Sequence, residues 1–135
     1  MSTPAARALA MPHPGDPSAL AFRTFLAVAE RLALPVKDRL ALLGIAKSTY
    51  TVWLKRLEQG DPADLDGDKL DRMAFVLGIY ELAGGVFPDG VAWLTRPNRA
   101  PAFGGRRPLD RMLDGHMADL METLSYLKTA SMGLL

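Results

Sequence analysis

The sequence contains no cysteine, which excludes a disulfide framework and a thiolate metal site and fits a protein of the reducing cytoplasm. It also has no long apolar run. The longest, residues 73–80, falls far short of the roughly 20 apolar residues that a membrane-spanning helix needs. An apolar patch near the N-terminus ends at Pro12 and is too short for a signal peptide. We therefore expect a cytoplasmic protein that does not span a membrane.

Groups that could carry catalysis are scarce. The two histidines, His13 and His116, are isolated and form neither a metal site nor a catalytic triad. The acids Asp64, Asp66 and Asp68 lack the residue order and the distal glutamate of a calcium loop. Asp66 is better placed to cap the helix that follows it. These patterns predict no enzymatic activity, no metal site and no cofactor.

Apolar residues recur at helical spacing along most of the chain. No pair of segments shows the period of two that is typical of strands, so we expect an all-α fold. Residues 1–17 are rich in proline and alanine and are predicted to form a disordered arm. Residues 18–60 are predicted to form a helix-turn-helix domain. Residues 61–135 should form a second domain on a long central helix, which ends at Gly84 and Gly85.

The predicted helix-turn-helix domain has three short helices. The first follows Asp16, which can cap it, and buries Leu20 together with its aromatic residues. The second ends at Gly44, and Ser48 or Thr49 can cap the third. A helix, a glycine-containing turn and a helix with a polar N-terminus are typical of the helix-turn-helix motif.

The first 60 residues are basic, with eight Lys and Arg against four Asp and Glu, whereas the remainder of the chain is acidic overall. Such a split is expected of a nucleic-acid-binding face, although ordinary solvated helices produce it as well. With Trp53 and Leu54 facing inward, the third helix presents a polar face whose first residues can reach base edges while its cations hold phosphates. The predicted DNA-binding residues are Lys47, Ser48, Thr49, Tyr50, Thr51, Lys55 and Arg56.

The stretch from residue 93 to residue 135 contains the most residues that predict where helices and turns begin and end. A proline should end a short helical turn, because the residue before a proline is disfavoured in the helical region. Two adjacent glycines then permit left-handed backbone angles, and a second proline suits the first turn of a new helix. Apolar spacing beyond it predicts two helices with one break. These features lie at Trp93, Pro97, Gly104, Gly105, Pro108, Asp114 and Gly115.

In this order the motifs resemble the C-terminal domain of the Xre/MbcA/ParS family of bacterial antitoxins. That pattern is Trp-Leu, Pro-Asn, a glycine turn, Arg-Pro-Leu, an acidic-Gly step and a leucine-rich helix. Here it is carried by Trp93 and Leu94, Pro97 and Asn98, Gly104 and Gly105, Arg107 to Leu109, Asp114 and Gly115, and residues 120–127. Residues 42–53 resemble the family's Xre-like N-terminal domain, although the helix after Trp53 runs slightly longer than is usual.

The resemblance implies an antitoxin that binds a RES-domain toxin acting on NAD, occludes its active site with the C-terminal region and represses its own operon as a homodimer. The alternative is a stand-alone helix-turn-helix regulator of transcription. The methionines of the C-terminal region suit an adaptable contact surface, and the apolar tail would be costly in water unless a partner covered it. Arg106 and Arg107 could bridge toxin acids or a substrate phosphate. The predicted toxin-binding residues are Trp93, Asn98, Phe103, Gly104, Gly105, Arg106, Arg107, Met117, Met121, Lys128, Met132, Leu134 and Leu135.

Overall fold

The computed structural model describes residues 17–60 and 65–135. These residues form seven α-helices and no strand, which confirms the predicted all-α fold. The helices are α2 (Pro17–Arg31), α3 (Val36–Leu43), α4 (Lys47–Glu58), α5 (Gly67–Val86), α6 (Gly90–Thr95), α7 (Pro108–Leu113) and α8 (Met117–Ser131). The predicted cap Asp16 and nearly all of the predicted arm lie outside the described residues. None of these helices is both long and apolar enough to cross a lipid bilayer.

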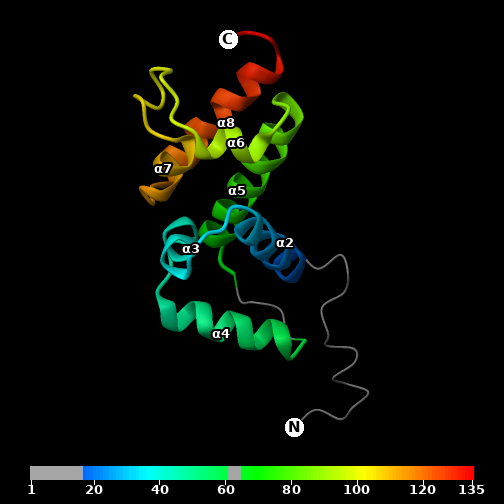
Figure 1. Cartoon of the computed structure of the whole chain (residues 1–135). Coiled ribbons are helices and arrows are strands. Elements are labelled where there is room, and N and C mark those ends of the chain that lie inside the picture. Colours follow the sequence, from blue (N-terminus) through cyan, green and yellow to red (C-terminus); the bar gives the residue numbers. More distant parts are fainter. Residues whose placement is uncertain (1–16, 61–64) are drawn as a thin grey trace.

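The central element is α5, as the apolar pattern predicted. It packs against α2 and α3 near its N-terminal half and against α6 and α8 toward its C-terminal half, so that α2 to α4 lie at one end of the molecule and α6 to α8 at the other (Figure 1). Because neighbours pack on several sides, its buried residues are not confined to a narrow stripe. They are Met73, Val76, Ile79 and Ala83.

The two ends of α5 compare differently with the prediction. Its start is confirmed, because Asp66 Oδ1 accepts a hydrogen bond from the Lys69 N–H at 2.9 Å. The predicted end at Gly84 and Gly85 is wrong, since the helix continues through both glycines to Val86. A glycine within a helix costs only about 1 kcal/mol relative to alanine. The chain then turns tightly into α6, where a Cβ on Gly90 would lie 2.6 Å from the Gly84 nitrogen.

Helix α4 is joined to α2 through aromatic side chains. Phe22 of α2 is buried, and its ring meets the edges of Tyr50 and Trp53 from α4 at centroid distances of 6.2 and 5.7 Å. Gly44 ends α3 with φ 65°, as its position in the turn requires. The predicted cap at Ser48 or Thr49 is wrong, because α4 already begins at Lys47 and its N-cap residue, Ala46, offers no side-chain hydrogen bond.

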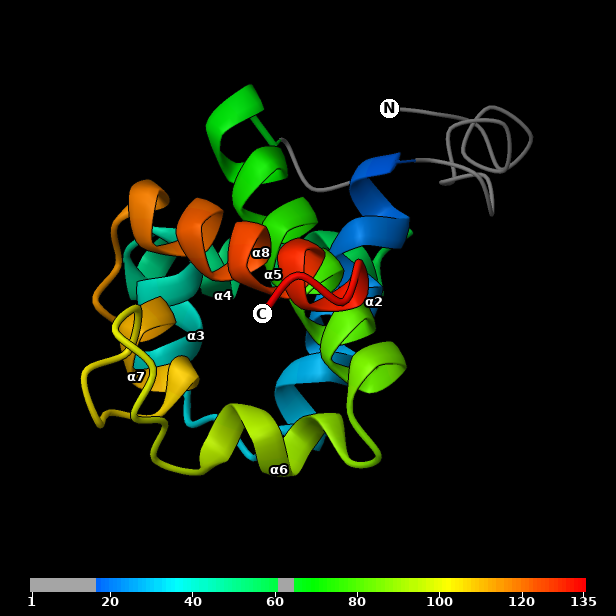
Figure 2. The same ribbon diagram turned by 90° about the horizontal axis from the view of Figure 1, so that it is seen from above.

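Two apolar residues expected in the core are exposed. Leu20 of α2 is 51% exposed and Leu54 of α4 is 37% exposed. Each lies beside the buried stripe of its helix, where helical spacing alone does not separate inside from outside. The core itself is one continuous cluster that runs from Phe22 to Leu127. Viewed from above, α8 and α5 cross near the centre of the molecule, while α6 and α7 lie at its edge (Figure 2).

Candidate functional site

The C-terminal region is built on a short helix that local interactions start and stop. Asp89 Oδ1 accepts the Ala92 N–H at 3.0 Å and caps α6. The helix ends at Thr95, and Arg96 adopts extended angles before Pro97, as predicted. Residues 96–107 then form a long loop between α6 and α7.

Asn98 closes this loop through the main chain. Its N–H donates to the Arg106 carbonyl at 2.9 Å, and its own carbonyl accepts the Gly105 N–H at 2.8 Å. The side-chain oxygen of Asn98 also accepts the Ala100 N–H at 2.9 Å. Gly104 and Gly105 have φ values of 58° and 86°, so the predicted left-handed turn is confirmed. The loop is therefore a closed and internally bonded structure.

Four aromatic rings hold the loop against α8. Trp93 stacks on Phe87 and on Tyr126, with ring centroids 4.9 and 6.0 Å apart. Phe103 meets the edges of Trp93 at 5.7 Å and of Tyr126 at 5.0 Å. Trp93 is half-buried, but Phe103 is only 4% exposed. In this conformation the Phe103 ring fills the space between the loop and α8, and its role in toxin binding stays a prediction.

Arg106 and Arg107 are engaged with carboxylates of the same domain. Arg106 makes a bidentate pair with Asp114, with both N–O distances at 2.9 Å, and also donates to the Asp110 carbonyl at 3.1 Å. Arg107 donates to Asp110 Oδ1 at 2.6 and 3.0 Å. These hydrogen bonds hold the pKa of Asp110 and of Asp114 below the usual carboxyl value. Each arginine must therefore break its ion pair with a carboxylate of its own chain before it can bind an acidic group of a partner.

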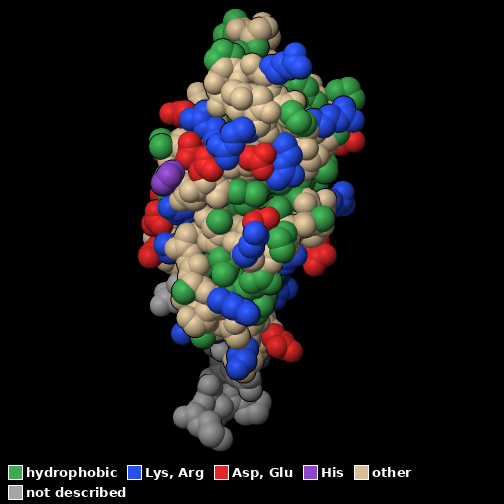
Figure 3. All heavy atoms as spheres, turned by 60° about the vertical axis from the view of Figure 1, so that its left-hand side comes forward, with side chains coloured by type: hydrophobic (Ala, Val, Ile, Leu, Met, Phe, Trp, Pro, Cys, Tyr) green, Lys and Arg blue, Asp and Glu red, His purple; other side chains and the backbone are tan. Residues whose placement is uncertain are grey.

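Arg111 is the cation that sequence reasoning missed. From α7 it donates to the Ala102 carbonyl at 2.7 Å and to Asp119 of α8 at 3.1 Å, and it also pairs with Glu122. It thus ties the loop, α7 and α8 together across the break at Gly115, where φ is 84°. Its partners lie eight or more residues away, beyond the spacing at which helical charge pairs can be read from a sequence. Figure 3 shows basic and acidic side chains interspersed in a band over this side of the molecule.

The exposed face of α8 is a single stripe. Met117, Met121, Lys128 and Met132 are separated by four, seven and four residues, and this spacing places them on one side of the helix. Met121 is 51% and Met132 64% exposed, Lys128 is exposed, and Met117 is half-buried. We call these four residues and the exposed Leu134 and Leu135 the α8 stripe. Its opposite side is core, where Leu120, Thr123 and Leu127 are buried.

At the other end of the molecule, α4 presents most of the predicted DNA-binding residues to solvent. Lys47, Ser48, Thr51, Lys55 and Arg56 are exposed, and Thr49 is partly covered. Tyr50 is only 4% exposed and packs on Phe22, so its expected exposure is wrong. Val52, which sequence reasoning left out, is 47% exposed. Figure 1 shows α4 far from the end of the chain, so the two candidate surfaces are separate.

Neither surface has the residues of a metal centre. In residues 17–60 and 65–135, no three or more His, Cys, Asp and Glu side chains are placed to hold a metal ion. The exposed groups at both surfaces offer apolar burial, hydrogen bonding and charge pairing.

Comparison with known proteins agrees with this geometry. Residues 80–130 match the antitoxin Xre/MbcA/ParS C-terminal toxin-binding domain, which includes Trp93, the closed loop and most of α8. The chain is 30% identical over 107 residues to the uncharacterized protein y4oB of Sinorhizobium fredii, covering 76% of this chain and 78% of that protein. No solved structure gives a significant match. The chain therefore belongs to the same family as y4oB and carries the C-terminal toxin-binding domain of the Xre/MbcA/ParS antitoxins.

Proposed function

We propose that the protein is an antitoxin that neutralises a RES-domain toxin acting on NAD, and that the α8 stripe is its inhibitory surface. The observation that carries this proposal is the exposure of three large apolar residues, Met132, Leu134 and Leu135, directly after a toxin-binding domain. Apolar side chains that protrude together are costly in water and gain free energy when a partner covers them. Methionine adapts its shape to the surface that it meets.

The remainder of the toxin-binding domain acts as a rigid support. The aromatic cluster around Trp93 and the ion pairs of Arg106, Arg107 and Arg111 hold the loop and α7 against α8. A preorganised surface loses less conformational entropy on binding than a flexible one. In this mechanism α8 docks beside the toxin's active site, and the residues after Ser131 reach into the cleft and exclude NAD. The antitoxin performs no chemistry of its own.

The choice of a RES-domain toxin and of NAD as its substrate rests on the family resemblance of the motifs between Trp93 and Leu127. The toxin consumes NAD, either by degrading it or by transferring ADP-ribose from it. Protection is therefore measurable as the NAD content of cells that express the toxin with or without this protein.

A pair of matched variants tests the inhibitory surface. Met121→Glu places a charge in the α8 stripe, and Val52→Glu places the same charge at a similarly exposed apolar position on α4. We expect Met121→Glu to weaken binding of a catalytically inactive toxin by at least tenfold and to lower cellular NAD, because the carboxylate must be desolvated in the interface. Val52→Glu should match the unchanged protein in both measurements. Equal behaviour of the two variants would refute the assignment of the α8 stripe.

We further propose that the protein represses its own operon as a homodimer in the cytoplasm. Support comes from the exposed cations Lys47, Lys55 and Arg56 around Ser48 and Thr51 on α4, an arrangement that suits phosphate and base contacts. A single helix-turn-helix covers little DNA, so two copies spaced by one helical turn are the common solution. Binding to the operator should weaken steeply as salt is raised. A chain that binds DNA but no toxin would favour the alternative, a stand-alone regulator.

A further inference from the structure

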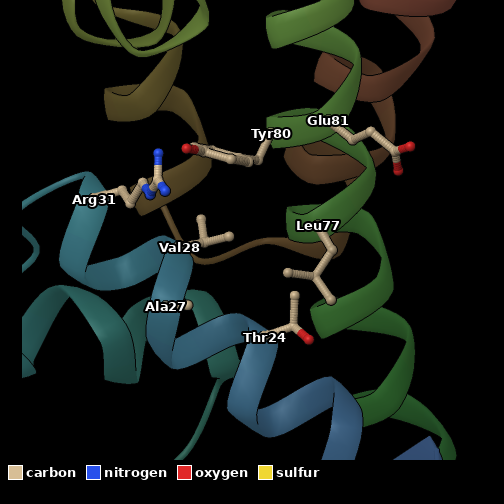
Figure 4. Close-up of a pocket in the computed structure, with 7 residues that line it drawn as sticks. All are labelled: Thr24, Ala27, Val28, Arg31, Leu77, Tyr80 and Glu81. Carbon is tan, nitrogen blue, oxygen red and sulfur yellow. The ribbon is translucent and has the colours of Figure 1, made fainter. Parts of the chain in front are cut away.

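Most of the exposed apolar side chains have other apolar side chains beside them. A groove of about 520 Å³ runs between α2 and α5, and Figure 4 shows Val28 of α2 and Leu77 of α5 along its walls. The exposed Leu20 lies four residues before Thr24 of the groove lining, on the same side of α2. The α8 stripe is a second such group. Apolar side chains gathered in this way are typical of surfaces that other proteins cover.

Val52 of α4 is exposed in different surroundings. Its side chain is 47% exposed, and its exposed neighbours one helical turn away are Ser48, Lys55 and Arg56. Lys55 and Arg56 form no ion pair with any other residue that the structure describes. Val52 is therefore an isolated apolar group within a polar and cationic surface.

The two exposed hydroxyl groups near Val52 differ in their hydrogen bonds. Thr51 Oγ1 donates to the Lys47 carbonyl at 3.0 Å, so its proton is used within the helix. The Ser48 hydroxyl makes no hydrogen bond to another described residue and can serve as donor and acceptor for a partner. This part of α4 thus offers an apolar group, a hydroxyl group and two cations to the same partner.

The major groove of duplex DNA presents groups that match this surface. Each A·T base pair places the C5-methyl group of thymine beside hydrogen-bonding groups of the base edges, and the phosphates of the backbone line the groove. Val52 lies in the first half of α4, and the first half of a recognition helix is the part that reaches base edges. A thymine methyl group and the Val52 methyl groups would leave water together, which is favourable. An apolar protein surface would instead bury Lys55 and Arg56 without counter-charges, which costs free energy.

We propose that Val52 is a specificity-determining residue, which contacts the C5-methyl group of a thymine in the major groove. Because a G·C base pair carries no such methyl group, the contact selects a thymine at one position of each half-site. Lys55 and Arg56 bind phosphates beside it and add affinity without sequence preference. The inference rests on the operator binding of the proposed function and names the residue and the base that give this binding its selectivity.

Deoxyuridine tests the contact, because it pairs as thymine does but lacks the C5-methyl group. The full-length chain selects duplexes from a random-sequence library, and each thymine of the selected site is then replaced in turn by deoxyuridine. Dissociation constants are measured by fluorescence anisotropy. At one thymine of each half-site, we expect the replacement to weaken binding of the unchanged protein about fourfold, the effect of one buried methyl group. Val52→Ala should bind both duplexes equally, about as weakly as the unchanged protein binds the deoxyuridine duplex.

Two controls separate this contact from a general effect on α4. Leu54→Ala removes a similarly exposed apolar side chain, at 37%, two residues along the helix and so on another side of it. This variant should keep the fourfold preference for thymine. Val52→Ala should keep the salt dependence of the unchanged protein, because valine neutralises no phosphate. Since α4 is far from α8, Val52→Glu remains a control for toxin binding in cells that express both proteins from foreign promoters (Figure 1).

The possible outcomes separate this inference from the proposed function. Sequence-specific binding that no deoxyuridine replacement weakens would overturn the thymine contact and leave the repressor function standing. A Val52→Ala variant that keeps the full preference for thymine would overturn the role of Val52, since another residue would then contact the methyl group. A chain that selects no duplex would overturn the repressor function together with this inference. Circular dichroism confirms that each variant keeps its helical content, as expected because alanine favours helices more than valine does.

Discussion

Replacing Arg111 should destabilise the toxin-binding domain more than replacing any exposed cation. The side chains of Arg111 and Asp119 are only 18% and 19% exposed. Arg111→Met keeps the aliphatic stem but removes the hydrogen bonds to Asp119 and to the Ala102 carbonyl. Among the described residues, the Asp119 carboxylate would then keep only His116 as a side-chain partner, at 3.1 Å. The Asp119 carboxylate and the Ala102 carbonyl would each lose a charged hydrogen-bond donor. Both lie in a partly buried place, where an unsatisfied polar group destabilises the folded state.

We expect the free energy of unfolding to fall by about 2–3 kcal/mol, from the typical cost of leaving such groups unsatisfied. The pair with Glu122 adds little, because that carboxylate is 61% exposed. For a chain of this length the loss corresponds to a melting temperature about 8–12 °C lower. Urea and thermal unfolding followed by circular dichroism measure both quantities.

Arg99→Met is the matched control. Arg99 lies in the same loop, is exposed and pairs with no described residue, so its replacement should change stability by less than about 0.5 kcal/mol. Equal effects of the two variants, or a loss below about 1 kcal/mol for Arg111→Met, would refute the view that Arg111 joins the loop to α8.

Three further predictions concern the loop, its charges and α4. Gly105→Ala should cost about 1 kcal/mol of unfolding free energy because φ is 86°, whereas Gly67→Ala, where a Cβ meets nothing, should be neutral or stabilising in the same urea titration. The pKa of Asp110 is lowered in the folded chain, so its contribution to stability is present above about pH 4 and is lost as the pH falls through the folded value. Asp110→Asn should flatten this dependence in melting curves between about pH 2 and 5. Lys47→Glu with Lys55→Glu should abolish operator binding in a gel-shift assay yet leave toxin neutralisation intact, and a loss of neutralisation would contradict the separation of the two surfaces.

Features set by neighbouring residues could be read from the sequence. The cap at Asp66, the end of α6 before Pro97 and the left-handed turn at Gly104 and Gly105 each depend on residues a few positions apart. The start of α7 at Pro108 belongs to the same group. Such signals act through the local backbone, so tertiary packing rarely overrides them.

Features set by distant residues could not be read in this way. Tyr50 and Phe103 have rings that suit either a core or an interface, and only the position of Phe22 or of Tyr126 decides which. The end of α5 was misplaced because glycines often follow the end of a helix, whereas this helix continues through Gly84 and Gly85 to Val86. Arg111 joins three segments through partners eight or more positions away. The groove between α2 and α5 depends on how two helices far apart in the sequence cross.

The most direct test of the account removes the end of the α8 stripe. The full chain and a chain that stops after Thr129 are each co-expressed with the cognate RES-domain toxin. Growth is recorded, and the molar mass of each complex is measured by size-exclusion chromatography with light scattering. We predict that the full chain restores growth and co-elutes with the toxin. The shortened chain, which lacks Met132, Leu134 and Leu135 but keeps the buried face of α8, should fail to restore growth. A full chain that neither binds nor protects would contradict the antitoxin function, and equal protection by both chains would contradict the inhibitory role of the tail.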